Sequence, residues 1–207
     1  MAVGLAAIGT AAIKGSEPRA SAATSMSMNH KPVTLDPGEG VAPKTPSPPP
    51  GQTHAPNASP RPKAGRLVVP SVGLSVPLGT MRETDGEITP PGFTSAYQID
   101  NLGVTPSNGR DGTVFVAMHS LRGGAIGPGN YLTDVAKGVA KVAIGALVEV
   151  DGVDYRITGW ARVKKADLPY LPFVWNDTPN RLVMITCLEL PSGAPSVDNM
   201  VLTAERD

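Results

Sequence analysis

Two residues that can do covalent chemistry stand where predicted strands end. Cys187, the only cysteine of the chain, closes the apolar and β-branched run "RLVMITC", and His119 closes the run "TVFVAMH". A thiol is mostly protonated at neutral pH, but a neighbouring imidazolium lowers its pKa and supplies a proton to a leaving group. Cys187 and His119 are therefore candidates for a nucleophile and its acid–base partner.

Plainer roles compete with this hypothesis. A lone cysteine on a strand is more often a small buried filler, and a lone histidine more often makes a structural hydrogen bond. One cysteine excludes an internal disulfide and a cysteine-based metal cluster. The other two histidines, His30 and His54, lie in an N-terminal segment rich in proline, so we expect no metal and no cofactor.

The composition narrows the class of protein. The chain has 207 residues, with 18 basic and 18 acidic side chains, so its formal net charge is zero. Such a balance, with no basic run interleaved with aromatic residues, gives no support for nucleic-acid binding. The 23 glycines and 22 prolines favour strands, turns and an unstructured segment over a helical bundle.

Three regions follow one another along the chain. Residues 1–13 are apolar but shorter than the roughly 20 residues of a membrane-spanning helix, so they are either a frayed terminus or the remnant of a signal peptide or membrane anchor. We favour the remnant. Residues 14–64 are predicted to be a disordered, proline-rich linker with six basic and three acidic side chains. Residues 65–207 form the predicted folded domain.

The folded region is predicted to be mainly β. Asp151-Gly152 between two alternating runs in 146–165 predicts a hairpin. The stretch 66–79 predicts two short strands separated by proline and glycine, and three more strands are expected at 112–120, 181–190 and 199–206. One helix is predicted near 130–138. Short strands with frequent turns indicate a closed or nearly closed β-barrel.

The order of these segments resembles that of the sortases, most closely the actinobacterial class F sortases. "TVFVAMHS", "GPGNYLTDVAKG", the hairpin, "RLVMITC" and "DNMVLTAE" follow one another as they do in that family, and the resemblance covers about residues 65–207. It implies a closed eight-stranded β-barrel with one or two short helices.

The resemblance also implies an activity. Sortases are membrane-anchored cysteine transpeptidases that cut an LPXTG-like sorting signal of surface proteins and pass the acyl group to an amine, often of a peptidoglycan precursor. Cys187 would be the nucleophile, His119 the general acid and then base, and Thr186 would shape the substrate pocket. The implied place is the outer face of the bacterial membrane, through an N-terminal anchor, or the medium after secretion.

One family residue is missing. Sortases carry an arginine on the strand after the cysteine, where it holds substrate and oxyanion. The resemblance places the class F arginine at Val197 and the arginine of the other sortase classes at Asn199, and neither residue is cationic. Three explanations are open: Asn199 donates a hydrogen bond in its place, Arg122 or Arg206 reaches in, or the barrel is a degenerate module that binds sorting peptides with little turnover. A further alternative is an unrelated Cys–His hydrolase of wall peptides.

Other residues near the predicted site receive plainer interpretations. Glu189, two residues after Cys187, is expected to be a solvated loop carboxylate. Trp160 and Trp175 either line a peptide groove or pack on the barrel. The prolines of "LPYLPFVW", residues 168–175, predict an ordered loop over the barrel.

Overall fold

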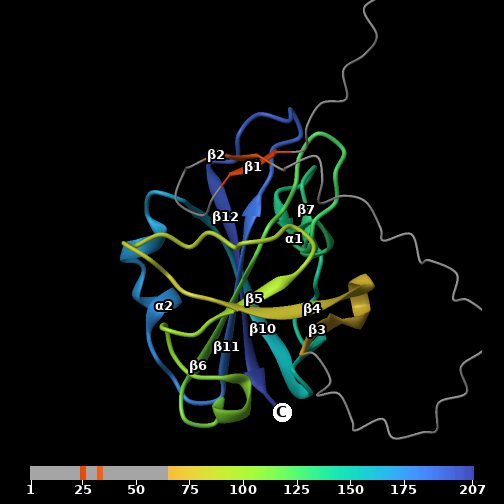
Figure 1. The fold of residues 1–207 in the computed structure, drawn as a ribbon. Coiled ribbons are helices and arrows are strands. Elements are labelled where there is room, and N and C mark those ends of the chain that lie inside the picture. The colour runs from red at the N-terminus through yellow and green to blue at the C-terminus, as the bar shows by residue number, and fades with distance from the viewer. Residues whose placement is uncertain (1–23, 27–31, 35–64) are drawn as a thin grey trace, which may run out of the picture.

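A closed barrel of eight strands carries the protein's predicted site (Figure 1). The structure is a computed structural model that describes residues 24–26, 32–34 and 65–207. Around the barrel the strands follow the order β10-β12-β11-β6-β5-β4-β3-β9. Their bounds are β3 Arg66–Val69, β4 Leu74–Met81, β5 Ala96–Ile99, β6 Thr113–Met118, β9 Leu147–Val150, β10 Val153–Lys164, β11 Arg181–Leu188 and β12 Asp198–Arg206. The predicted eight-stranded closed barrel is confirmed.

Strands β6 and β11 pair in parallel along the whole length of β6, as β4 and β5 do elsewhere in the barrel. Every residue of β6 and all but the first of β11 are buried, because one face lines the barrel and the other is covered from outside. Burial on both faces explains why both sequences are continuous apolar runs without polar alternation.

The turns between β3 and β4 and between β9 and β10 lie where the sequence predicts them. Asp151 and Gly152 both have positive φ, 52° and 77°, as a two-residue hairpin turn between β9 and β10 requires. The short 3-10 helix η1 (Pro70–Val72) separates β3 from β4 and ends at Gly73, whose φ is 70°. A second 3-10 helix, η2 (Pro106–Asn108), precedes β6.

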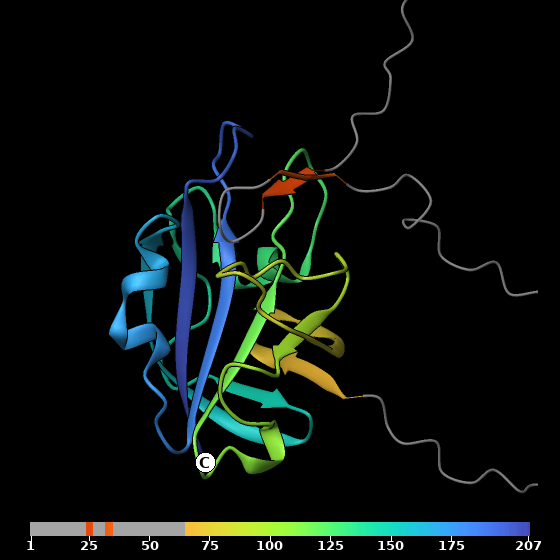
Figure 2. The same cartoon turned by 60° about the vertical axis from the view of Figure 1, so that its left-hand side comes forward.

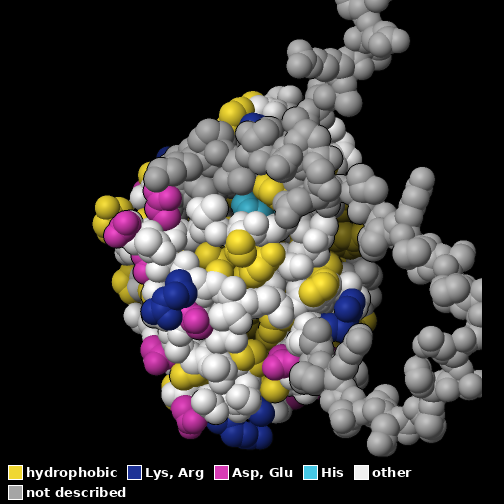
Figure 3. Space-filling model, viewed as in Figure 1, with side chains coloured by type: hydrophobic (Ala, Val, Ile, Leu, Met, Phe, Trp, Pro, Cys, Tyr) yellow, Lys and Arg dark blue, Asp and Glu magenta, His cyan; other side chains and the backbone are white. Residues whose placement is uncertain are grey.

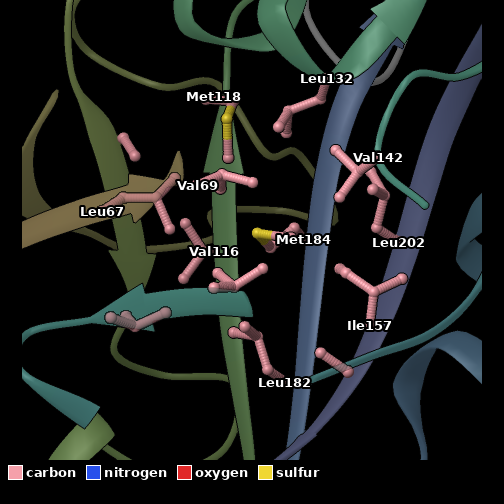
Figure 4. Packing of buried hydrophobic residues seen from close by; sticks show 14 of the residues in the cluster. Leu67, Val69, Val116, Met118, Leu132, Val142, Ile157, Leu182, Met184 and Leu202 are labelled. Carbon is pink, nitrogen blue, oxygen red and sulfur yellow. The ribbon is translucent and has the colours of Figure 1, made fainter. Parts of the chain in front are cut away.

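The barrel interior is filled by aliphatic and sulfur-containing side chains from every part of the sheet (Figure 4). The members of this cluster are all hydrophobic. Those labelled in the figure are Leu67, Val69, Val116, Met118, Leu132, Val142, Ile157, Leu182, Met184 and Leu202. Their burial is the main force that closes the barrel.

A second apolar cluster lies on the outer face of β6, β11 and β12. The segment that follows β10 covers it with the 3-10 helix η3 (Leu168–Tyr170) and with α2 (Pro172–Trp175). Figures 1 and 2 both show α2 outside the barrel wall. The ring of Trp175 packs on Phe115 of β6 with centroids 5.6 Å apart. The predicted ordered loop at 168–175 therefore consists of two short helices.

The helix predicted near 130–138 is wrong in extent. Helix α1 spans Pro128–Leu132, and the chain then forms the small hairpin of β7 (Thr133–Asp134) and β8 (Val139–Ala140). Pro128 favours the first helical turn because its φ is already helical. Gly138, with φ 68°, permits the turn that returns the chain along β7.

Two three-residue strands lie within the predicted linker. Strand β1 (Thr24–Met26) pairs antiparallel with β2 (Pro32–Thr34). The predicted apolar segment 1–13 and the rest of the predicted linker lie outside the described residues. Within the described part of the chain, no helix is both long enough and apolar enough to cross a membrane.

Candidate active site

The parallel pairing of β6 with β11 brings Cys187 and His119 to the same level of the barrel. The last paired residues are Thr186 and Met118, so Cys187 and His119 are the next residues on two strands about 4.8 Å apart. Cys187 belongs to the outer-face cluster with Ala117, the residue two before His119. Because side chains alternate along a strand, both candidate residues face this outer side.

The imidazole of His119 is buried and held from two sides. Its Nε2 donates to the carbonyl oxygen of Pro90 at 2.9 Å, and its ring stacks on Phe93 with centroids 4.7 Å apart. Burial lowers the pKa of His119, and the charge of Lys165 lowers it further, against the hydrogen bond to Pro90, which raises it. The neutral ring then carries its proton on Nε2 and its lone pair on Nδ1.

The thiol of Cys187 has a cationic neighbour that the sequence analysis missed. The Nζ of Lys165 donates to Sγ of Cys187 at 3.3 Å, and both residues are at most 1% exposed. Lys165 directly follows β10, which carries a bulge between Ile157 and Gly159. The bulge reverses which residues face outward, so simple alternation from Ile157 would have turned Lys165 away from Cys187.

Asn199 and Val197 occupy different places. Asn199 is fully buried and lies opposite Cys187 in the ladder between β11 and β12. Val197 is 52% exposed, and its carbonyl oxygen accepts a hydrogen bond from the backbone N–H of Lys165. Val197 is thus the ladder neighbour of Lys165, and Asn199 is that of Cys187.

Thr186 faces away from the thiol. Its hydroxyl lies 3.0 Å from that of Ser120, and both side chains are buried against Gly129 of α1. This contact ties the end of β11 to the loop after β6. The predicted role of Thr186 in shaping the substrate pocket remains a prediction.

Of the two arginines considered as substitutes, only Arg122 lies near the site. Arg122 is half-buried and lines a hollow of about 440 Å³ between the loops that follow β6 and β11. Arg206 pairs with Tyr155 at the far end of β12, seven residues from Asn199 and therefore about 23 Å away. The hypothesis that Arg206 reaches the thiol is wrong, because a side chain cannot span that distance.

Glu189 is not a solvated loop carboxylate, as the sequence suggested, since only 3% of it is exposed. It lines the same hollow as Arg122. Burial raises the pKa of Glu189, while the charges of Lys165 and Arg122 oppose that rise. The loop after β11 folds back over the strand end, which alternation within β11 does not predict.

A separate, mostly apolar hollow of about 380 Å³ lies further along the outer face. Its lining includes Phe115 of β6, Leu168 and Trp175 of the covering segment, and Ile88 and Leu102 of two loops. The indole Nε1 of Trp175 donates to the carbonyl oxygen of Leu168 at 2.7 Å, which fixes this wall. Trp160 instead lies 41% exposed on β10.

The face viewed in Figure 3 gathers hydrophobic side chains near its middle, with charged groups of both signs around them. Among the described residues, no three histidine, cysteine or acidic side chains are grouped to hold a metal ion. The groups that the structure brings together at the ends of β6, β10 and β11 are a thiol, an imidazole and a buried lysine amine.

Comparison with known proteins identifies the barrel. Sortase A from Corynebacterium diphtheriae, as a lid mutant, matches with a TM-score of 0.50 and 16% identity over 73% of this chain and 74% of that one. Sortase C1 from Streptococcus agalactiae matches with a TM-score of 0.50 and 14% identity, over 72% and 70% respectively. No family model and no curated protein matches the sequence. The chain has the sortase fold, and its neighbours are sortases of classes A and C.

Proposed function

We propose that the protein is a sortase-type cysteine transpeptidase, similar to class F, that cuts an LPXTG-like sorting signal and transfers it to an amine. The observation that carries this proposal is the placement of Cys187 and His119. They directly follow the last paired residues of two neighbouring parallel strands, and side-chain alternation turns both to the outer side of the barrel. Such a pair supplies a nucleophile and a proton carrier, which acyl transfer through a thioester requires.

The first half of the reaction uses the neutral imidazole. Nδ1 of His119 accepts the thiol proton as Sγ of Cys187 bonds to the scissile carbonyl carbon, and the carbonyl electron pair moves to oxygen. The tetrahedral intermediate then expels the amine, which takes the proton from His119, and a thioester remains on Cys187. Since both side chains are buried, the segment around Pro90 and Phe93 has to give way to the peptide.

The second half reverses these roles. The incoming amine loses a proton to His119 as it attacks the thioester, and Sγ leaves as a thiolate that recovers this proton. No net oxidation or reduction takes place, so neither half needs a cofactor. A peptidoglycan-type amine is the proposed acceptor, on the basis of the resemblance to sortases.

The apolar hollow supports a short extended peptide as the substrate. Phe115 lies four residues before His119 on β6, which corresponds to about 13 Å along the strand. An extended peptide of four residues has the same length, so the apolar side chain at the start of an LPXTG-like signal reaches the hollow when its threonine carbonyl lies at Cys187. Burying a leucine side chain there contributes about 1.5–3 kcal/mol.

Asn199, Arg122 and Thr186 are proposed to assist Cys187 and His119 without taking part in the covalent steps. The amide of Asn199 would hydrogen-bond the oxyanion or the peptide, a role that its position opposite Cys187 in the ladder supports. Arg122 lines the neighbouring hollow, where it would meet the part of the substrate beyond the cleaved bond or the acceptor. Thr186 acts through its contact with Ser120 and positions the strand end.

The proposed location is the outer face of the bacterial membrane, or outside the cell after secretion. The sorting signals and wall amines that the reaction requires are found there. The apolar residues 1–13 and the proline-rich residues 14–64 are the proposed anchor and stalk.

A second candidate function is a degenerate module that binds sorting peptides with little turnover. The exposed Val197 at the position of the family's arginine favours it. Loss of one oxyanion donor lowers rates by about 10²–10³. Both candidate functions predict that the protein binds sorting peptides, but only the transpeptidase predicts efficient turnover.

The deciding experiment incubates the full chain with an LPXTG-type peptide and an amine acceptor. We expect mass spectrometry to detect an acyl group on Cys187 and the transpeptidation product, and Cys187→Ala to abolish both. His119→Ala should lower the rate by about 10²–10⁴. Peptide binding by calorimetry without adduct or product would reject turnover and favour the degenerate module.

A further inference from the structure

The ammonium group of Lys165 is the cation in contact with the candidate nucleophile. Its Nζ lies 3.3 Å from Sγ of Cys187 as a hydrogen-bond donor, and the lysine is 1% exposed. Taking an ammonium group out of water costs several kcal/mol unless an opposite charge or strong acceptors compensate. A thiolate at Cys187 is such a compensating charge.

The backbone holds Lys165 in this place. Its N–H donates to the carbonyl oxygen of Val197 at 3.0 Å, which extends the ladder of β10 and β12 by one residue. Val163, two residues earlier, packs in the same outer-face cluster as Cys187. The side chain of Lys165 thus lies on the outer face. Asn199 is on β12, next to the strand of Cys187, and Lys165 follows β10, the strand beyond β12.

The other charged and titratable groups around the thiol are less suited than Lys165 to stabilise a thiolate at Cys187. His119, directly after β6, has its pKa lowered by burial, so it is mainly neutral at neutral pH. Glu189, on the loop after β11, is acidic and repels a thiolate. Lys165 acts on the charge of Glu189 as well as on the thiol, and Arg122, on the loop after β6, acts on Glu189 more weakly and lines the hollow.

We propose that Lys165 is a catalytic residue that replaces the family's missing arginine: its ammonium stabilises the Cys187 thiolate and then the oxyanion. The cation comes from β10 instead of β12, from the residue directly opposite Val197. This proposal rests on the transpeptidase function for the oxyanion and on the structure alone for the thiolate. Lys165 keeps its protons throughout and forms no covalent bond.

The charge follows the reaction. His119 takes the proton of Sγ and holds it for the leaving amine. As Sγ of Cys187 bonds to the carbonyl carbon, the negative charge moves from sulfur to the carbonyl oxygen two bonds away, so the same ammonium stays beside it. Fixed charges that already point at the place where charge develops need no reorganisation during the reaction. When the amine leaves, the thioester is neutral and Lys165 returns to its original contacts.

The test measures the thiolate without any substrate. The chain has one cysteine, so the ultraviolet absorbance of thiolate against pH, with Cys187→Ala as baseline, reports Cys187 alone. We expect Lys165→Met to move the titration midpoint upward by about 1–3 pH units. Lys165→Arg should keep the midpoint low, because arginine retains the charge and cannot act as a base. Lys164→Met, a change at the adjacent exposed lysine, should leave it unchanged.

Transpeptidation rates of the same variants test whether Lys165 also stabilises the oxyanion. Lys165→Met should lower the rate by about 10²–10³, and Lys165→Arg should restore most of it. Adding Val197→Arg to Lys165→Met should restore both the midpoint and part of the rate, because the two residues are ladder neighbours. Should Lys165→Met not fold, Lys165→Gln, which keeps the length without the charge, takes its place.

Several results would overturn the proposal. One is a midpoint that does not move in folded Lys165→Met, and another is a stable acyl group on Lys165 that resists hydroxylamine, since it would mean a neutral, nucleophilic amine. If Lys165→Met shifts the midpoint while no peptide is ever transferred, the thiolate assignment stands and the transpeptidase function fails. If product forms equally with and without Lys165, the function stands and this inference fails.

Discussion

At the scale of single residues, burial is the main influence on the groups around Cys187. It lowers the pKa of His119 in the same direction as the charge of Lys165, and it raises the pKa of Glu189 against the charges of Lys165 and Arg122. Lys165 is the amine in hydrogen-bond contact with the thiol.

A stability measurement tests the buried carboxyl. The pKa of Glu189 is higher in the folded than in the unfolded chain, so its contribution to stability is fully present below about pH 4.3 and is lost as pH rises through the folded pKa. Glu189→Gln keeps the shape and cannot ionise. We expect its free energy of unfolding, relative to wild type, to be larger at pH 7.5 than at pH 4.

Denaturant unfolding at both pH values supplies this comparison. Each pH unit of pKa elevation corresponds to about 1.4 kcal/mol at neutral pH. Glu205→Gln, at an exposed position of β12, should show no such difference. A Glu189→Gln variant that loses stability on going from pH 4 to 7.5 as wild type does would contradict the prediction.

At the scale of elements, the ends of β6 and β11 are aligned by packing against α1. The backbone N–H of Gly129 donates to the carbonyl oxygen of His119 at 2.9 Å. A Cβ at Gly129 would collide with the hydroxyls of Ser120 and Thr186, which are hydrogen-bonded to each other. Glycine is required here because the helix approaches the residues next to His119 and Cys187 too closely for any side chain.

Gly129→Ala therefore tests whether this contact positions the site. The methyl group has to displace α1 or the strand ends, and we expect a loss of about 1–3 kcal/mol in unfolding free energy. The rate of Cys187 alkylation at a fixed pH should change as well, because the thiol follows Thr186 directly. Thermal and denaturant unfolding measure the first effect and mass spectrometry the second.

The matched control for this variant is Gly159→Ala on β10. Its Cβ would meet a single side-chain oxygen, that of Thr203, at 3.3 Å, and a small rotation relieves that contact. It should leave the alkylation rate of Cys187 unchanged. Wild-type stability and alkylation in Gly129→Ala would show that α1 does not hold the site.

At the scale of the whole molecule, two apolar layers make the barrel rigid enough to hold a row of side chains. One layer fills the interior, and the other joins the outer face of the sheet to η3 and α2. The candidate site lies on the second layer, with Cys187 itself among its members. Packing of the interior thus sets the strand positions on which the site depends.

Two isoleucines of different burial test this dependence. Ile157→Ala removes a side chain that is 1% exposed inside the barrel and should cost about 2–5 kcal/mol of unfolding free energy. Ile144→Ala removes one that is 69% exposed and should change stability by about 0.5 kcal/mol or less. Denaturant unfolding of the full chain compares them, and equal losses would refute the assignment of the interior core.

The sequence by itself determined the features that depend on neighbouring residues. Apolar runs, proline and glycine breaks and the Asp151-Gly152 turn specify most strands of the barrel, since strand pairing and turns have local signatures. The ends of two such runs also located Cys187 and His119. The helix near 130–138 was misplaced because a short helix has a weak pattern and packing decides its bounds.

Tertiary structure alone decided what surrounds the thiol. A bulge in β10 turned Lys165 toward Cys187, and the path of the loop after β11 buried Glu189. The register of β12 placed Arg206 far away and Asn199 opposite Cys187. These facts depend on pairing between residues distant in sequence, and a shift of one residue in a strand sends every side chain to the other face.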